Sequence, residues 1–163
     1  MEATRWLDEH QDRAWRGYRR MRRLLDLELA RELTQDASLS EPDYDVLSDL
    51  SETPQGRLRL SELADRMLWS RSRLSHHLTR MQQRGLVTRE ECPDDARGAM
   101  VVLTPAGRDA IEAAAPGHVT AVRQHFLDLL TPAEVEALGA FTHRVVDHLA
   151  QNRAPRPRRG REG

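Results

Sequence analysis

The 163-residue sequence contains no lysine, a single cysteine and few aromatic residues. The single cysteine, Cys92, excludes an internal disulfide and fits a reducing compartment. No apolar run approaches the roughly 20 residues that a membrane-spanning helix needs, and the polar, charged N-terminal stretch does not have the pattern of a signal peptide. We therefore expect a cytoplasmic protein. Aromatic residues make up only 4% of the chain, but hydrophobic residues reach 39%, which is enough for a core.

The net charge of −1 hides a strong asymmetry along the chain. Residues 24–56 hold nine acidic residues against one base, Arg31, whereas residues 57–89 hold eight arginines against Glu62 and Asp65. A concentrated basic region is typical of a protein whose partner is a polyanion. A charged face that is only solvated is the alternative.

The first part of the chain has the pattern of one long helix, from about 7 to 33, without proline. A second helix is expected after Ser40, which can act as its N-cap, with Pro42 in the first turn. Aspartates in that turn favour the positive end of the helix dipole. The segment "TPQGRLRL" then predicts a turn that leads into a short extended segment.

Two short helices are expected next. Ser61 is predicted to cap the first, over about 62–68, and Ser70 the second, which runs to Arg84 and ends at Gly85. Two such helices joined by a tight turn form a helix-turn-helix.

Two strand candidates follow, 86–91 and 99–103, joined by the loop "CPDDARG". Thr104-Pro105 then opens a helix that we expect to kink or break at Pro116-Gly117. A capping-box pattern at Thr131-Pro132-Ala133-Glu134 starts a final helix with one apolar face. From Arg153 onward the chain is rich in Pro, Arg and Gly and is predicted to be disordered.

The helix after Ser70 has an unusual surface composition. On a helical wheel Leu74, Leu78 and Met81 form one narrow apolar face, and no acidic residue occurs from Trp69 through Arg89. A donor-rich helix suits the major groove, which presents acceptors at guanine and adenine. An ordinary amphipathic surface helix is the alternative. The residues expected to contact DNA are Ser70, Arg71, Ser72, Arg73, His76, His77 and Arg80.

The predicted hairpin supplies a second DNA-binding candidate. Arg97 lies in its loop, and an arginine at the tip of a two-stranded wing is favoured by the negative potential of the minor groove. Asp95 is expected to pair with Arg97 and set its direction. For Asp94 and Asp95 the alternative role is an Asx-type turn that closes the hairpin.

The segments "RLRLSELADRM", "SRSRLSHHLTRMQQRGLVTRE" and "CPDDARGAMVVLTPAG" together resemble the MarR family of winged-helix transcriptional regulators. The resemblance covers roughly residues 6–149 and includes the family's Asp-x-Arg wing as Asp95-Ala96-Arg97. It implies a mainly α fold with a small antiparallel β wing. It also implies a homodimer that binds a pseudo-palindromic operator in double-stranded DNA. Many relatives are repressors released by a small ligand, often phenolic, or by thiol oxidation.

On this resemblance the chain is expected to divide into four parts. A winged helix-turn-helix lobe lies between the two segments of a helical dimerisation platform, and the large apolar faces of the terminal helices favour such a platform independently. The expected bounds are 1–39 for the first platform helix, 40–104 for the lobe, 105–152 for the remaining platform helices and 153–163 for the tail.

Other functions are weaker candidates. Cys92 is flanked by carboxylates rather than by the cations that favour a reactive thiolate, so a structural role is preferred to a redox sensor. Neither a metal site, a cofactor motif nor a catalytic motif is predicted, so we do not expect an enzyme. The class that competes with a DNA-binding regulator is a protein–protein interaction module built on a winged helix.

Two further hypotheses concern an effector and the tail. Trp15, Tyr44 and Trp69 are candidates to line a pocket for a phenolic or other aromatic effector, although core or interface positions suit each of them as well. The arginines of the tail could add phosphate contacts, or the tail could be idle.

Overall fold

The computed structural model describes residues 4–92 and 95–153, with the backbone alone at 95–97 and 152–153. The chain divides into two compact units, with the boundary between Val122 and Arg123. The elements are α1 (Glu9–Ala37), α2 (Glu41–Ser51), β1 (Arg57–Arg59), α3 (Leu60–Arg66), α4 (Arg71–Gln83), β2 (Val87–Cys92), β3 (Asp95–Leu103), α5 (Pro105–His125), the 3₁₀ turn η1 (Leu127–Leu129) and α6 (Pro132–Arg153). The expected mainly helical fold with a small antiparallel sheet is confirmed.

Side-chain caps define where α2 and α4 begin. Ser40 and Asp43 form a reciprocal capping box at the start of α2, and the Ser70 hydroxyl accepts a hydrogen bond from the Arg73 N–H at 3.2 Å. Both starts agree with the sequence. The expected cap at Ser61 is wrong, because α3 already begins at Leu60, directly after the last residue of β1. The chain enters α3 straight from strand pairing, without a side-chain cap.

Of the kink or break expected at Pro116-Gly117, the break does not occur. Helix α5 runs without interruption from Pro105 to His125, with Pro116 inside it. Proline lacks a backbone N–H and therefore removes one hydrogen bond from the helix. The carbonyl of Pro116 accepts a hydrogen bond from the Thr120 hydroxyl at 2.9 Å. The hydrogen bonds of the remaining turns carry the helix past the proline.

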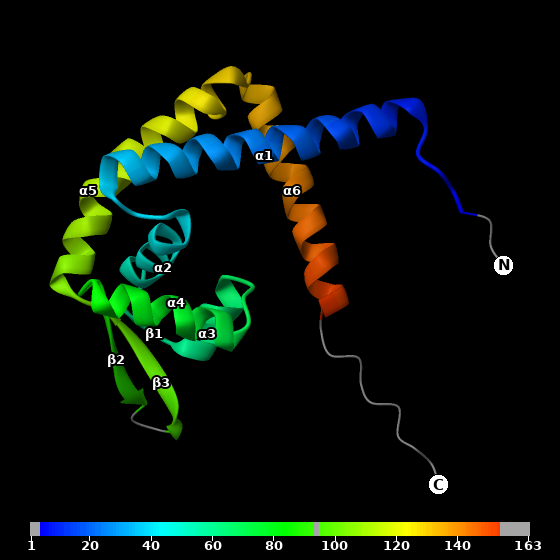
Figure 1. Cartoon of the computed structure of the whole chain (residues 1–163). Helices are drawn as coiled ribbons and strands as arrows, with labels where there is room; N and C mark the ends of the chain where they lie inside the picture. Colours follow the sequence, from blue (N-terminus) through cyan, green and yellow to red (C-terminus); the bar gives the residue numbers. More distant parts are fainter. Residues whose placement is uncertain (1–3, 93–94, 154–163) are drawn as a thin grey trace, which may run out of the picture. The chain divides into compact units, whose positions relative to one another are not determined.

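The sheet has the strand order β1-β3-β2, and both pairings are antiparallel. Leu58 of β1 pairs with Val101 of β3, and Val87 of β2 pairs with Leu103. A register shift between Glu91 and Cys92 interrupts the β2–β3 ladder near its far end. Figure 1 shows β2 and β3 as a hairpin that extends away from α3 and α4. Strand β3 is therefore the central strand, and the hairpin is the wing expected from the sequence.

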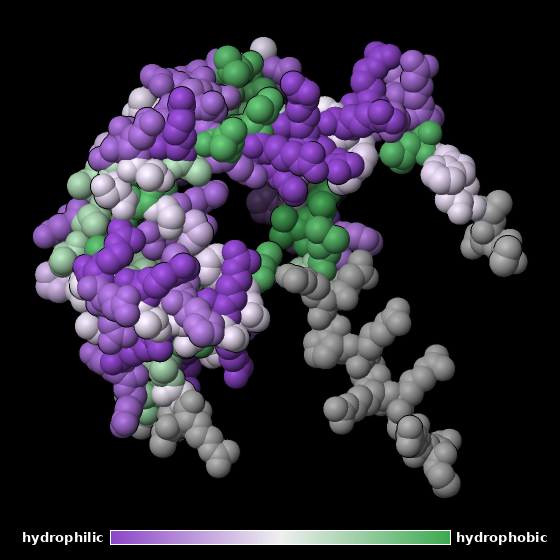
Figure 2. Space-filling model, viewed as in Figure 1, coloured by the Kyte–Doolittle hydropathy of each residue, from purple (hydrophilic) through white to green (hydrophobic). Residues whose placement is uncertain are grey.

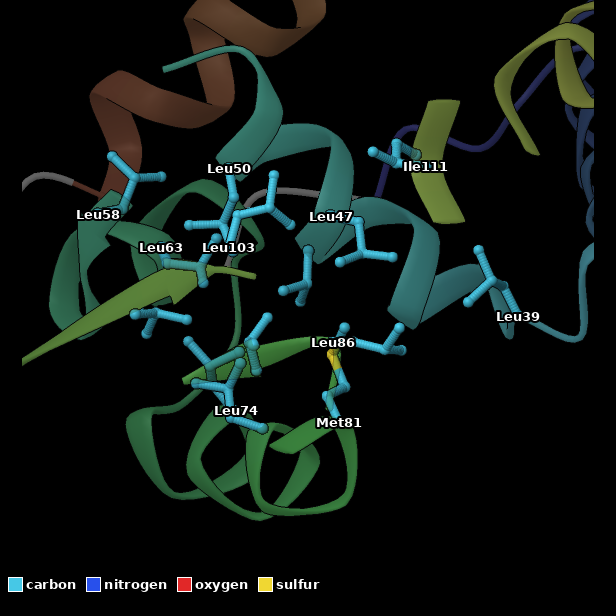
Figure 3. Packing of buried hydrophobic residues seen from close by; sticks show 14 of the residues in the cluster. Leu39, Leu47, Leu50, Leu58, Leu63, Leu74, Met81, Leu86, Leu103 and Ile111 are labelled. Carbon is cyan, nitrogen blue, oxygen red and sulfur yellow. The ribbon is translucent and has the colours of Figure 1, made fainter. Parts of the chain in front are cut away.

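One hydrophobic cluster joins α2, α3, α4 and the sheet. Leu47, Leu63, Leu74 and Val101 are fully buried in it and come from these four parts of the fold. Figure 3 shows the leucine side chains of the lobe converging between the helices and the strands. Because burial of one leucine stabilises a fold by about 1.5–3 kcal/mol, this cluster fixes α4 on the lobe and determines which of its faces is exposed.

The start of α5 is packed closely against the end of α4. The Thr104 hydroxyl accepts the Gly107 N–H at 2.9 Å and donates to the Gly85 carbonyl at 2.6 Å. A Cβ on Gly107 would lie 2.0 Å from the carbonyl oxygen of Leu86, a distance that only glycine avoids. Thr104 thus connects β3 to α5 through a tightly packed, hydrogen-bonded junction.

The second unit contains η1 and α6. Glu134 accepts hydrogen bonds from the backbone N–H and hydroxyl of Thr131, each at 2.8 Å, so the predicted capping box is confirmed. Large apolar side chains of α6 are exposed, and the hydrophobic colour gathers along this helix in Figure 2. They are Val135, Phe141, Val145, Val146 and Leu149. Across the described residues, no helix has the length and apolar character that would cross a membrane.

Candidate DNA-binding surface

Helices α3 and α4 are joined by a tight turn. The Trp69 N–H donates to the Ala64 carbonyl at 2.9 Å, and Leu68 adopts a left-handed backbone conformation with φ of 56°. Ala64 is buried, and its small side chain leaves room for the turn. Ser70 then caps α4, so the pair forms a helix-turn-helix, with α4 in the position of the recognition helix.

The two faces of α4 differ completely in character. Leu74, Leu78 and Met81 have no solvent exposure, whereas the opposite face is exposed and polar. Because the exposed face carries hydrogen-bond donors and no carboxylate, it matches the acceptors of DNA phosphates and base edges. The exposed predicted residues are Ser70, Arg71, Ser72, Arg73, His76 and Arg80.

The first turn of α4 contains a stacked arginine. The guanidinium carbon of Arg73 lies over the ring of half-buried Trp69. A stacked guanidinium keeps its N–H edges free to donate. Trp69 therefore supports Arg73 at the first turn of α4, and its role in an effector pocket stays a prediction.

The structure contradicts the prediction that His77 contacts DNA. Its residue exposure is 6%, and its Nε2 lies 3.1 Å from Oδ1 of Asp43 on α2. Nε2 makes no hydrogen bond, so this is a close polar contact between the ring and the carboxylate. A side chain enclosed in this way cannot reach a groove, so His77 does not belong to the proposed DNA contacts.

Arg89 is a site residue that sequence reasoning missed. From β2 its guanidinium donates to the Ser75 carbonyl and, at 3.1 Å, to the Thr79 hydroxyl, both on α4. The contact fastens the wing to the recognition helix. The sequence shows only an arginine in a strand, because its partners lie 10 and 14 residues away.

The tip of the wing falls partly outside the described residues. Asp95 and Arg97 belong to β3 by their backbone, but their side chains are not among those described, and neither is residue 94. The predicted Asp95–Arg97 pair therefore stays a prediction, as does any role of the tail from 154 onward. At the base of the wing Arg57 donates to Glu90 at 2.7 Å, which links β1 to β2 across β3.

The three aromatic residues proposed for an effector pocket occupy different surroundings. Trp15 stacks on Tyr18 at a centroid distance of 5.8 Å and is half exposed on α1. Tyr44 faces His118 at 4.3 Å, and Trp69 meets His77 edge-on at 5.6 Å. The structure thus gives each of the three a different neighbour and does not bring them together.

A cavity of about 40 Å³ lies between α1 and α5. Leu29 and Leu33 line one side, and Ala114 and His118 line the other. Nδ1 of His118 is buried and has no hydrogen-bond partner. A cavity that binds benzene measures about 150 Å³, so this one is too small for an aromatic ring in the conformation described.

Cys92 lies at the end of β2 and is 5% exposed. Burial agrees with its interpretation as a structural residue and shields the thiol from oxidants. In the ranges 4–92 and 95–153 no three His, Cys, Asp or Glu side chains are grouped so as to hold a metal ion.

Comparison with known proteins identifies the family. The MarR family model matches residues 39–98, which span α2 through the first residues of β3. The transcriptional regulator HosA of Escherichia coli O111:H- is 30% identical over 132 residues, covering 81% of this chain and 96% of HosA. The chain belongs to the MarR family. The resemblance carried by its motifs is thereby confirmed.

Two solved MarR family regulators from Streptomyces coelicolor share the fold. AbsC superposes with a TM-score of 0.87 at 40% identity, over 91% of this chain and 99% of AbsC. Sco3205, solved in complex with DNA, has the same TM-score and identity over 91% of this chain and 93% of Sco3205. The protein is a MarR-family transcriptional regulator of the winged helix-turn-helix type.

Proposed function

We propose that this MarR-family regulator binds a pseudo-palindromic DNA site as a homodimer, with α4 of each copy in a major groove. The observation that carries the proposal is the exposed face of α4, which is rich in donors and free of acidic residues. It lies beside a wing that Arg89 fastens to the same helix. A single surface therefore offers both a groove-reading helix and a flanking wing.

In this proposal the N-terminus of α4 and its exposed face contact different parts of the DNA. Its first N–H groups and the side chains of Ser70, Arg71 and Ser72 meet phosphates, because a helix N-terminus attracts anions. Arg73, His76 and Arg80 reach base edges or adjacent phosphates. Arg97, oriented by Asp95, contacts the flanking minor groove.

The exposed apolar faces of the terminal helices support the homodimer. Besides the α6 side chains, five residues of α1 are more than 40% exposed. Contiguous apolar surface of this kind marks a protein interface. The α1 residues are Trp15, Tyr18, Met21, Leu24 and Leu27.

Sedimentation velocity tests the homodimer. The wild-type protein is expected to sediment as a dimer, and Val145→Glu, which places a charge in the apolar face of α6, to shift it toward the monomer. Arg144→Ala, on the neighbouring exposed position, should leave the dimer intact. A wild-type monomer at micromolar concentration would contradict the proposal.

Selection of bound fragments from random DNA tests the operator. Two-fold symmetry predicts two inverted half-sites about one helical turn, or roughly 34 Å, apart. Binding should also weaken steeply with salt, because each neutralised phosphate adds about 0.9 to the slope of log K against log salt. A winged-helix module for protein–protein interaction would show neither a recovered palindrome nor such a slope.

We further propose that the regulator acts as a repressor and that a small effector releases it. A dimer that covers two successive grooves blocks the same DNA for other proteins. The cavity between α1 and α5 is the candidate entry point, and an aromatic effector must enlarge it by separating the two helices. Such a separation would displace α2, because α2 packs on α1.

Thermal-shift measurements against a panel of phenolic compounds test the effector. A compound that binds the cavity should raise the unfolding temperature of the wild-type protein. Ala114→Leu, which fills the cavity, should abolish the shift, while Trp15→Ala, away from the cavity, should keep it. No stabilisation by any compound would count against release by a phenolic ligand and leave the proposed DNA binding untouched.

A further inference from the structure

A buried carboxylate joins α4 to the start of α2. Oδ2 of Asp43 accepts hydrogen bonds from the Ser40 N–H at 3.0 Å and from Nη1 of Arg84 at 2.7 Å. Its other oxygen faces His77 Nε2 at 3.1 Å. The side chains of Asp43 and His77 are only 6% and 8% exposed, so water screens this contact weakly. Each carboxylate oxygen thus has a polar partner on α4 or on Arg84, the residue that caps its C-terminus.

The same histidine reaches the exposed face of α4 through its second ring nitrogen. Nη2 of Arg80 lies 3.1 Å from Nδ1 of His77, and the Arg80 side chain is exposed. A guanidinium can only donate, so Nδ1 is the acceptor and the proton of the neutral ring sits on Nε2, the ring nitrogen nearer Asp43. The imidazole therefore connects a buried carboxylate to an arginine on the DNA-facing surface.

We propose that Asp43 and His77 are positioning residues for DNA binding, which hold Arg80 in the direction in which it meets the DNA. The inference rests on the proposed function, because it takes Arg80 as a DNA contact. Only the neutral ring can do this. A protonated His77 would present an N–H to the Arg80 guanidinium and lose the acceptor, so acid weakens DNA binding through this residue.

Charged groups face His77 from both helices that pack around it. Burial lowers the pKa of His77 below its ordinary 6.5, Asp43 on α2 raises it, and Arg80 and Arg73 on α4 lower it further. The net pKa is lowered, and Arg84 neutralises Asp43 from its other side. His77 is therefore neutral near neutral pH and takes up a proton only in acid, where Arg80 is released.

Two substitutions separate the two ring nitrogens. His77→Asn places an amide oxygen near the Nδ1 position and keeps the acceptor for Arg80. His77→Gln reaches the Nε2 position and keeps the contact with Asp43 but leaves Arg80 without an acceptor. Neither side chain titrates. The measurement is fluorescence anisotropy of a labelled duplex recovered by the selection described above. It is made at about pH 7.5 and then in steps to well below the ordinary histidine pKa of 6.5, because the pKa of His77 is lowered from that value.

At the higher pH the Asn variant is expected to bind like the wild type and the Gln variant about tenfold more weakly. Lowering the pH should weaken the wild type relative to the Asn variant. His76 is present in all three proteins, so its titration cancels in the comparison. Thermal unfolding of each variant, measured alongside, separates loss of fold from loss of positioning.

The decisive control is the background Arg80→Met. There the Asn and Gln variants should bind equally, since the arginine that they position is gone. The inference would be overturned if His77→Asn and His77→Gln bound DNA equally with Arg80 present. It would also be overturned if the two still differed in the Arg80→Met background. An Arg80→Met protein that binds like the wild type would overturn it as well, although the proposed function would stand. A wild-type protein without salt-dependent DNA binding would instead overturn the proposed function.

Discussion

The guanidinium carbon of Arg73 lies 3.8 Å from the centre of the Trp69 ring. The ring of His77 also meets Trp69 edge-on, at a centroid distance of 5.6 Å. The stack restricts the plane of the guanidinium at the first turn of α4 before any DNA is bound. Since ordering a long side chain on binding costs about 0.5–1.5 kcal/mol, this pair reduces that cost at one proposed contact.

The first prediction concerns this stack. Arg73→Lys should weaken DNA binding by about 1 kcal/mol, or roughly fivefold, because lysine keeps the charge but neither stacks as a plane nor donates from a fixed fork. Trp69→Leu should weaken binding by a similar amount. Anisotropy titrations of both single variants and the double variant measure the coupling, and a double-variant loss equal to the sum of the two would show that the residues act independently. Arg71→Lys, at an exposed position without a ring, is the matched control.

A second prediction concerns the attachment of the wing. Arg89→Met should remove the bonds to Ser75 and Thr79 and make the backbone amides of β2 exchange faster with solvent. DNA affinity should fall while α5 and α6 keep their protection. Hydrogen exchange followed by mass spectrometry measures this. Thr88→Ala, on the exposed side of the same strand, should leave the exchange rates of β2 unchanged. If the β2 amides were equally protected in the Arg89→Met and Thr88→Ala variants, Arg89 would not be what attaches the wing to α4.

A third prediction concerns the close contact at Gly107. Gly107→Ala should destabilise the fold by about 1–3 kcal/mol, because its new Cβ would collide with the Leu86 carbonyl. In the same helix Gly117→Ala meets nothing within 4 Å and should stabilise the protein by roughly 0.5–1 kcal/mol through helix propensity. Urea unfolding of the two variants gives the comparison. If both changed the stability in the same direction, the packing described for α5 would be wrong.

A fourth prediction concerns the acidic side of α2. Burial raises the pKa of Asp45 above 3.8, neighbouring Asp49 raises it further, and His118 lowers it. The folded protein thus binds this proton more readily than the unfolded chain does. Asp45 therefore disfavours folding above its folded-state pKa, and that penalty disappears as the pH falls through the folded value toward 3.8.

Asp45→Asn should accordingly stabilise the protein near neutral pH by about 0.3 kcal/mol, a small amount because the carboxylate is only partly buried and solvent screens it. The gain over the wild type should vanish at acidic pH. Urea unfolding at low ionic strength across this range measures it, with Asp109→Asn as a control at an exposed position on α5. A gain that persisted below the ordinary aspartate pKa would assign the effect to something other than charge.

Local signals predicted much of the lobe. The caps at Ser40 and Ser70 and the capping box at Thr131 depend on residues three apart, so a sequence displays them directly. The ends of the two wing strands agree within a few residues with the predicted ones. The start of α3 was wrong because the end of β1 is set by pairing with β3, which is distant in the sequence.

The burial of His77 shows where local reasoning stops. A 100° wheel places it within 40° of Met81, at the edge of the apolar face, so its exposure is not decided by α4 alone. Asp43, 34 positions earlier in the chain, supplies the polar partner that makes burial tolerable. Contacts of this range, like those of Arg89, arise from tertiary packing and leave no periodic trace in the sequence.

Strand β3 has a mechanical consequence for the regulator. Its nine residues extend over roughly 30 Å, from the outer end of the hairpin to Thr104. There the hydroxyl bonds described above clamp the chain onto Gly85 and the first turn of α5. β2 pairs with the strand from Asp95 to Leu103, and β1 pairs with it at residues 100–102. The strand can therefore move as a rigid element. A small tilt of α5 at Thr104 would then produce a larger sideways displacement at the outer end of the hairpin.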